Sequence, residues 1–97
     1  MKQVELRPEA EAEIAEPAKW YDQESPGLGV SFIRAVQRAL TTIAEQPAAF
    51  SSIGLGARRF VIRKFPYGII YRQEGDVIVV YSCFHGHRNP KEWRKRL

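Results

Sequence analysis

Val77-Ile78-Val79-Val80-Tyr81-Ser82-Cys83-Phe84 decides the fold, together with Ile69-Ile70-Tyr71-Arg72, which precedes it across the connection 73–76. The run 77–84 is almost continuously apolar and rich in β-branched side chains, which is typical of a strand buried on both faces. The connection Gln73-Glu74-Gly75-Asp76 is short and contains glycine, so the two runs are expected to pair as a β-hairpin. The chain therefore contains an antiparallel sheet with residues 77–84 as its central strand.

The residues before this hairpin predict a further strand. Residues 58–65 alternate between two faces, one of which is partly cationic. Phe60, Ile62 and Lys64 fall on one side, and Arg59, Val61, Arg63 and Phe65 fall on the other. Pro66-Tyr67-Gly68 predicts a turn or bulge before the next strand. Residues 51–56 contain two glycines and show no periodicity, so they are expected to form an irregular loop.

The first half of the chain follows a helical period instead. Apolar side chains recur at helical spacing in two stretches, which predict two helices. The first stretch carries Ala10, Ile14, Ala18 and Tyr21, and the second carries Phe32, Val36, Ala39, Leu40 and Ile43. The first turn of the first helix holds acidic groups that complement the positive end of the helix dipole. These are Glu9, Glu11 and Glu13.

Proline and glycine mark the helix boundaries. Pro17 lies inside the first helical pattern, where it is expected to kink the helix or to start a new turn. Residues 22–27 are predicted to separate the two helices. Ser25 is the expected N-cap of the second helix, with Pro26 as its first residue.

These patterns predict an α+β fold in a single domain spanning residues 1–97, because a chain of this length supports one modest core. Val4 and Leu6 share one face of a short N-terminal strand. The expected order is a strand at 3–7, a helical hairpin at 8–46, antiparallel strands at 57–85 forming a meander packed on the helices, and a basic tail at 86–97.

Charge and cysteine content limit the classes of partner and compartment. Residues 57–97 carry ten Lys or Arg against three acidic residues, whereas residues 1–56 are net acidic. A basic half favours an anionic partner: nucleic acid, a nucleic-acid enzyme, an acidic protein or a lipid surface. Cys83 is the one cysteine and lies in an apolar run, which indicates a reduced, buried thiol. The sequence shows no signal peptide and no apolar stretch of about 20 residues, so a cytoplasmic protein without a membrane segment is expected.

Several short motifs follow one another along the chain. They are Val4-x-Leu6-x-Pro8-x-Ala10-x-x-x-Ile14, Ser25-Pro26-Gly27, Arg59-Phe60-Val61, Phe65-Pro66-Tyr67-Gly68-Ile69-Ile70-Tyr71, Glu74-Gly75-Asp76-Val77-Ile78-Val79-Val80 and Phe84-His85-Gly86-His87-Arg88-Asn89-Pro90-x-x-Trp93. In this order, and over nearly the whole chain, they resemble the ParE branch of the RelE/ParE toxin superfamily. Each motif alone is weak, but together they are specific to the superfamily and not to one of its activities.

The resemblance implies the toxin of a bacterial type II toxin–antitoxin pair, held inactive by a cognate antitoxin with an acidic tail. ParE-like members of the superfamily inhibit DNA gyrase, and RelE-like members cut messenger RNA on the ribosome. Growth arrest and plasmid stabilisation are the implied consequences, and no cofactor is implied. Because a fold does not decide an activity, the residues must separate the two targets.

The nuclease alternative places demands on particular residues. Cleavage of RNA through the 2′-hydroxyl requires a base, an acid and cations that hold the phosphate. The candidates are His85 and His87 for proton transfer, and Arg59, Arg63, Lys64, Arg72 and Arg88 for the phosphate. RelE-like nucleases resemble one another in a catalytic Tyr or His near the C-terminus, whereas residues 91–97 contain neither.

This departure favours a gyrase inhibitor that acts by binding, with the ribosome-dependent endonuclease as the alternative. His85 and His87 are then expected to have structural roles at the end of a strand. A zinc site is not expected, because the two histidines and one cysteine in an apolar run fall short of a tetrahedral ligand set.

The basic tail is expected to contact a partner. Trp93 lies among cations, which is typical of an interface anchor, although it could instead dock on the chain's own helices. Nucleic-acid binding through phosphate contacts and base stacking is also compatible with this tail. Trp20 and Tyr21 are first expected to pack in the core or in the helical hairpin. The alternative is that Trp20 is partly exposed and receives an apolar side chain of the antitoxin. The predicted partner-binding residues are thus Trp20, Arg88, Trp93, Arg94, Lys95 and Arg96.

Overall fold

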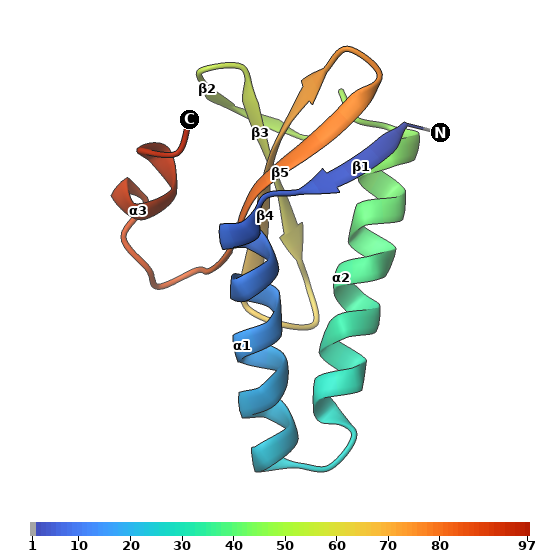
Figure 1. Ribbon diagram of the computed structural model, residues 1–97, viewed down its shortest axis with the longest axis vertical. Coiled ribbons are helices and arrows are strands. Elements are labelled where there is room, and N and C mark those ends of the chain that lie inside the picture. The colour runs from blue at the N-terminus through green and yellow to red at the C-terminus, as the bar shows by residue number, and fades with distance from the viewer. Residues whose placement is uncertain (1) are drawn as a thin grey trace.

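A five-stranded sheet and a helical hairpin form the body of the protein. A computed structural model describes residues 2–97. Its elements in chain order are β1 (Gln3–Leu6), α1 (Pro8–Glu24), α2 (Leu28–Glu45), β2 (Ser51–Gly54), β3 (Ala57–Ile62), β4 (Tyr67–Glu74), β5 (Val77–His85) and α3 (Lys91–Arg94). Figure 1 shows α1 and α2 side by side, with α3 set apart from them. The predicted α+β arrangement of strand, helical hairpin and antiparallel strands is confirmed.

The sheet has the strand order β1-β5-β4-β3-β2. β1 pairs in parallel with β5, while the other neighbouring strands are antiparallel. The expected hairpin is the pair β4–β5, in which Glu74 lies opposite Val77. A bulge interrupts this pair, because Ile70 is opposite Ser82 and Tyr71 is opposite Val80, which leaves Tyr81 as the extra residue.

α1 and α2 cover one face of the sheet, the inner face. The predicted apolar stripe of α2 is confirmed: Phe32, Val36 and Ile43 are buried in one core cluster with the inner side chains of the sheet. The ring of Phe32 lies 5.3 Å from that of Phe65 and 5.1 Å from that of Tyr67, measured between centroids. Burial of these side chains against the sheet is the main stabilising contribution to the fold.

The opposite face, called the outer face, has a smaller core of its own. Ile70 and Phe84 point to this face and cluster with Ala57 and with Trp93 of α3. Successive strand residues point to opposite faces, so β4 and β5 each contribute to both clusters. The prediction that residues 77–84 form a strand buried on both faces is therefore confirmed.

The connection between the helices differs from the expected one. Ser25 caps the C-terminus of α1, where its N–H donates to the carbonyl oxygen of Tyr21 at 2.9 Å. Gly27, with φ 87°, precedes the first residue of α2. The prediction of Ser25 as an N-cap and Pro26 as a helical residue is wrong, because a left-handed backbone conformation, which glycine adopts readily, starts the helix instead.

A close approach of the two helices fixes this hairpin. The N–H of Gly29 donates to Oδ1 of Asp22 at 2.8 Å, so an acidic side chain of α1 satisfies one of the first N–H groups of α2. A Cβ at position 29 would lie 2.4 Å from the carbonyl oxygen of Ala18. Glycine is therefore required at this crossing.

Two further expectations need correction. Residues 51–54 form the edge strand β2 instead of an irregular loop, with a register shift between Ser52 and Gly54. Phe65 does not share the outer face with Arg59 and Val61, because β3 ends at Ile62 and the following turn directs Phe65 into the inner core. Pro17 lies inside α1 as the sequence pattern indicated, and the helix continues beyond it to Glu24.

Candidate functional site

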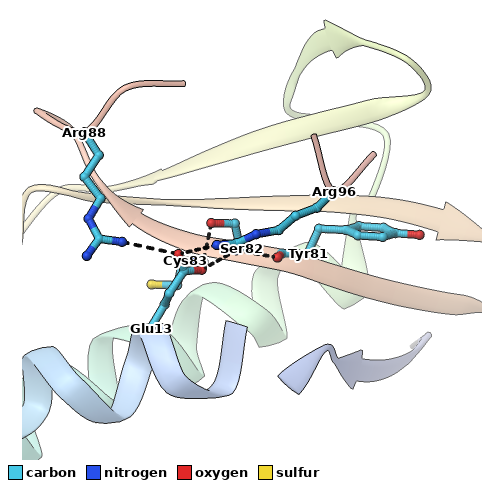
Figure 2. A network of polar contacts seen from close by, with 6 residues as sticks. All are labelled: Glu13, Tyr81, Ser82, Cys83, Arg88 and Arg96. Carbon is cyan, nitrogen blue, oxygen red and sulfur yellow. Dashed lines mark hydrogen bonds and ion pairs between the residues drawn. The ribbon is translucent and has the colours of Figure 1, made fainter. Parts of the chain in front are cut away.

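Within residues 2–97, no strand covers the edge of β5 beyond the end of β1, which pairs with residues 77–80. α1 follows β1 directly, and its residue Glu13 lies beside this edge (Figure 2). Oε1 of Glu13 accepts hydrogen bonds from the Ser82 hydroxyl at 2.8 Å and from the Cys83 backbone N–H at 3.2 Å. Because buried backbone groups need partners, the Glu13 carboxylate replaces a neighbouring strand at this point.

Two arginines from the C-terminal segment meet the same carboxylate. Nη1 of Arg96 donates to Oε1 of Glu13 at 2.8 Å, and Nη2 donates to Oε2 at 3.1 Å. Nη1 of Arg96 also donates to the carbonyl oxygen of Tyr81 at 3.1 Å. Nη1 of Arg88 lies 3.4 Å from Oε2 of Glu13. Figure 2 shows both guanidinium groups converging on Glu13 from different segments of the chain.

Burial distinguishes the two arginines. The Glu13 side chain is 12% exposed and that of Arg96 is 20% exposed, whereas the Arg88 side chain is 54% exposed. The hydrogen bonds to Glu13 raise the pKa of Arg96 above its ordinary value, against a smaller effect of burial. The bidentate pair with Arg96 is therefore a structural clamp on the tail, and Arg88 remains accessible.

Trp93 also holds the C-terminal tail on the outer face of the sheet, through apolar contacts. It is 3% exposed and its ring centroid lies 5.5 Å from that of Phe84. The guanidinium of the neighbouring Arg94 lies 5.5 Å from the centroid of the same ring. Among residues 2–97 the indole N–H has no hydrogen-bond partner, an unfavourable feature that the apolar contacts of the ring must offset.

A cleft opens on the outer face beside this tail. Its volume is about 300 Å³, and we call it the outer cleft; its lining is Arg59, Val61, Pro66, Tyr67, Gly68, Phe84, Gly86, Arg88 and Pro90. A Cβ at Gly68 would lie 3.4 Å from the Phe84 ring and 3.6 Å from side-chain carbons of Arg59. A Cβ at position 68 would therefore make ordinary van der Waals contacts with both side chains, and it would cover part of the cleft floor.

A second cavity, the Trp20 pocket, lies between α1 and the sheet. Its volume is about 380 Å³ and it is lined by Ala12, Glu13, Glu16, Pro17, Trp20, Tyr67, Cys83 and Arg88. Trp20 is 56% exposed, and its ring packs edge to face on Tyr21 at 5.2 Å between centroids. Tyr67 and Arg88 line both cavities, so these two residues separate the Trp20 pocket from the outer cleft.

The predicted proton-transfer residues lie at the end of β5. The rings of His85 and His87 stack at 5.1 Å between centroids, and Nδ1 of His85 accepts a hydrogen bond from the backbone N–H of His87 at 3.1 Å. His85 also packs edge to face on Tyr67 at 5.2 Å. One ring nitrogen of His85 is therefore used to shape the turn that follows the strand.

The predicted phosphate-binding residues are distributed over three places. Arg59 and Arg88 line the outer cleft, whereas Arg63 and Lys64 line a different depression beside α2. Arg72 donates to the carbonyl oxygens of Leu55 at 2.9 Å and Leu97 at 3.2 Å. Its guanidinium also lies 5.4 Å from the ring centroid of Tyr81. The donors of Arg72 are thus already used in contacts within the fold.

The structure changes the expectations for the tail. Trp93 docks on the chain's own fold, but on the outer face of the sheet and not on the helices, and its burial leaves little ring surface for a partner. Arg96 is engaged by Glu13. Arg94 and Lys95 are exposed, as are Arg88 and Trp20. The accessible members of the predicted partner-binding set are therefore Trp20, Arg88, Arg94 and Lys95.

Glu13 and Tyr67 belong to the site but were not among the site residues predicted from the sequence. Glu13 is one of several acidic residues near the start of α1, and its partners lie 69 to 83 positions away in the chain. Tyr67 was part of an expected turn, but it begins β4 and its side chain is half-buried. Burial raises the pKa of its hydroxyl above the ordinary value, so the phenol is neutral at physiological pH.

Burial also determines the chemistry of Cys83. Desolvation, followed by the nearby Glu13 carboxylate, raises the pKa of the thiol from 9.0 to about 12. The thiol is therefore protonated and a poor nucleophile at neutral pH. Residues 2–97 contain no cluster of three potential metal ligands. None of the helices in the same range combines the length and hydropathy that a bilayer span requires.

Comparisons with known proteins agree with this architecture. A solved structure described as "Chromosomal ParDE TA system from P. aeruginosa" is similar with a TM-score of 0.74 and 17% identity, over 88% of this chain and 96% of that chain. At this identity the likeness concerns the fold. No curated protein sequence matches the chain. The family model described as "ParE toxin of type II toxin-antitoxin system, parDE" matches residues 4–90. The chain therefore belongs to the ParE toxin family of type II toxin–antitoxin systems.

Proposed function

We propose that this chain is a toxin that arrests growth by binding and inhibiting DNA gyrase in the cytoplasm, and that a cognate antitoxin neutralises it. In this proposal residues 1–97 act as one toxin domain. Membership of the ParE toxin family, over residues 4–90, supports the assignment to a toxin–antitoxin pair. The choice of target rests on the geometry of the site, because a fold hosts more than one activity.

The observation that carries a binding function is that the residues predicted for RNA cleavage do not all lie at one site. Tyr67 pairs with His85, whereas Arg72 lies five positions further along β4. At a rise of about 3.4 Å per residue, the two positions are about 17 Å apart. His85 and Arg72 therefore do not converge on one phosphate, and Arg72 is bonded to backbone carbonyls.

Gyrase assays test the proposal directly. The purified protein should inhibit plasmid supercoiling by gyrase and alter its cleavage–religation equilibrium, and induction in bacteria should trigger the DNA-damage response. The cognate antitoxin should restore supercoiling when added in equimolar amount. Unchanged gyrase activity together with cleavage of ribosome-bound message would show that the proposed target is wrong.

The Trp20 pocket is the place where we expect the antitoxin to insert an apolar side chain. The exposed indole and the neighbouring apolar groups of Ala12 and Pro17 offer a hydrophobic seat, and Arg88 offers a cation at its border. An amphipathic acidic segment matches this combination. Trp20→Ala should lower antitoxin affinity by about tenfold or more, as is typical of an aromatic anchor. Lys19→Ala, an exposed neighbour on α1, is the matched control and should bind as tightly as the wild type.

The nuclease alternative retains one specific point in its favour. Arg59, Arg88 and Tyr67 line one cleft, and His85 packs on Tyr67 at its border. If the protein cuts RNA, His87→Ala or Arg88→Ala should abolish cleavage while the antitoxin still binds. Under the proposed function the same variants leave ribosome-bound message as intact as the wild type does.

A further inference from the structure

The outer cleft combines an apolar floor with two cations. Val61 is 60% exposed on β3, and Pro66, Phe84 and Pro90 add further apolar surface. Arg59 and Arg88 come from different segments of the chain and line the same cleft. An exposed apolar group bordered by charges is typical of a protein-binding surface.

The two arginines differ from their neighbours in being available. Arg58 donates to the Phe50 carbonyl oxygen at 2.7 Å, and the fold likewise uses Arg72 and Arg96. Arg59 has no hydrogen bond or ion pair within residues 2–97 except those of its backbone in β3, and it is exposed. In the same residue range the Arg88 side chain has one polar contact, to Glu13 at 3.4 Å, and retains unused donors. A ligand that enters the cleft therefore meets two guanidinium groups that can still form charged hydrogen bonds.

We propose that the outer cleft binds a segment of the toxin's target protein in which one apolar side chain is flanked by carboxylates. The apolar side chain covers Val61 and the adjacent prolines, and the carboxylates pair with Arg59 and Arg88, since guanidinium groups bind carboxylates in a bidentate manner. This inference rests on the proposed function for the identity of the target. It goes beyond that function in naming the binding surface and the chemistry of the segment it holds.

Charge complementarity and the apolar floor select this occupant. Residues 57–97 carry ten basic against three acidic side chains, which accelerates encounter with an acidic surface. A single-stranded nucleic acid would use stacking on exposed aromatic rings, but Phe84 and Trp93 are buried and Tyr67 is half-buried. A phosphodiester would also leave the exposed Val61 without an apolar partner. A peptide segment of the proposed kind pairs with both arginines and also covers the apolar floor.

Glu13 is a positioning residue for this cleft. Its carboxylate holds the accessible Arg88 at the border and fixes the tail through Arg96. Glu13→Gln keeps the shape of the side chain and removes its charge, so the Arg88 guanidinium loses its electrostatic restraint. The variant should weaken target binding less than a change of Arg59 does, because Glu13 itself does not line the cleft.

The affinity of variants for purified gyrase tests whether the outer cleft is the surface that binds the target. Arg59→Glu should lower the affinity for gyrase by about tenfold or more, because it replaces attraction by repulsion. Val61→Thr, nearly isosteric and suited to a strand, should lower it by a few fold through loss of apolar contact. The matched control is Arg34→Glu, which makes the same charge change on the exposed side of α2 and should bind as the wild type does. Circular dichroism and antitoxin binding verify that each variant is folded.

A peptide titration separates this inference from the proposed function. The amide NMR signals of Val61 and Gly68 should shift when an acetylated Glu-Glu-Leu-Glu-Glu peptide is added, and Arg59→Glu should abolish the shift. If the wild type binds this peptide but not gyrase, the proposed target is wrong and the cleft assignment stands. If the peptide leaves these signals unchanged, or if an RNA oligonucleotide shifts them at lower concentration, the inference is overturned. Gyrase binding that Arg59→Glu and Val61→Thr leave intact overturns it as well.

Discussion

The two faces of the sheet are covered in different ways. The inner face carries two long helices and a cluster of aromatic rings that includes Phe32, Phe65 and Tyr67. The outer face carries the four-residue helix α3, one buried indole and a tail that Glu13 clamps by charge. The inner face therefore provides most of the stability, and the outer face leaves part of its surface open for binding. Perturbations of the two faces should consequently have different consequences.

Phe32→Ala should have the largest effect on stability. The side chain is fully buried and contacts three aromatic rings, so its removal leaves a cavity in the inner core. The expected loss is about 3–5 kcal/mol in the free energy of unfolding, which is a large part of the total for a domain of this size. Urea denaturation followed by circular dichroism measures it.

Trp93→Ala is the counterpart on the outer face. Its ring is also buried, but it belongs to a short terminal helix that can detach while the sheet and long helices stay folded. Hydrogen exchange should show unprotected amides in residues 91–97 and little change in β4 and β5. Equal loss of protection in both regions would show instead that the two faces unfold as one unit.

Glu13→Gln should have a smaller effect, centred on the edge of β5. The amide can still accept from Ser82 and Cys83, but the charged clamp on Arg96 is lost. Removing one partner of a partly buried pair should cost about 1–3 kcal/mol. Faster amide exchange at residues 81–83 and in the tail would verify the effect. Arg96→Gln should reproduce the change in the tail but not at residues 82 and 83.

The accuracy of prediction from the sequence differs between the two faces of the sheet. Local patterns are sufficient for the inner layer: the stripe from Phe32 to Ile43 marks α2, and the run 77–84 marks β5. β2 escaped prediction because Gly54, Leu55 and Gly56 have positive φ and its register shifts, which hides the period of two. The Glu13 network depends on where α1 lies along the edge of β5 and where the tail returns. No local pattern encodes such a meeting of distant segments.

Alkaline pH should lower the stability of the fold through Cys83, which is buried in the inner face. Its pKa rises from 9.0 to about 12 in the folded protein, so the native thiol keeps its proton while the unfolded thiol loses it. The contribution to stability is complete below about pH 9 and is lost as the pH rises towards about 12. At about pH 10 the loss should amount to about 1.4 kcal/mol, since one pKa unit corresponds to this free energy.

The variant Cys83→Ala is the control for this pH dependence of stability. The variant should be less stable than the wild type at neutral pH but should lose stability more slowly between about pH 9 and about pH 12. Tyr67 and Tyr71 also have pKa values raised, chiefly by burial, and both titrate in the two proteins. The charge of Cys83 also raises the pKa of Tyr67, so loss of this interaction is part of the difference expected between the two proteins. Parallel curves of unfolding free energy against pH would show that the Cys83 thiol is not buried as described.

The smallest effect is expected from Lys2→Ala, which removes an ion pair unlike that of Glu13. Nζ of Lys2 lies 3.2 Å from Oδ1 of Asp76, but the Asp76 side chain is 98% exposed. Water and salt screen such a pair, and holding two mobile side chains together offsets most of the attraction. Thermal unfolding of Lys2→Ala and Asp76→Asn should therefore match that of the wild type within error, at low and at physiological salt. The loss caused by Glu13→Gln should persist under both conditions. A comparable loss in all three variants would mean that net charge, and not burial of the clamp, holds the tail on the outer face.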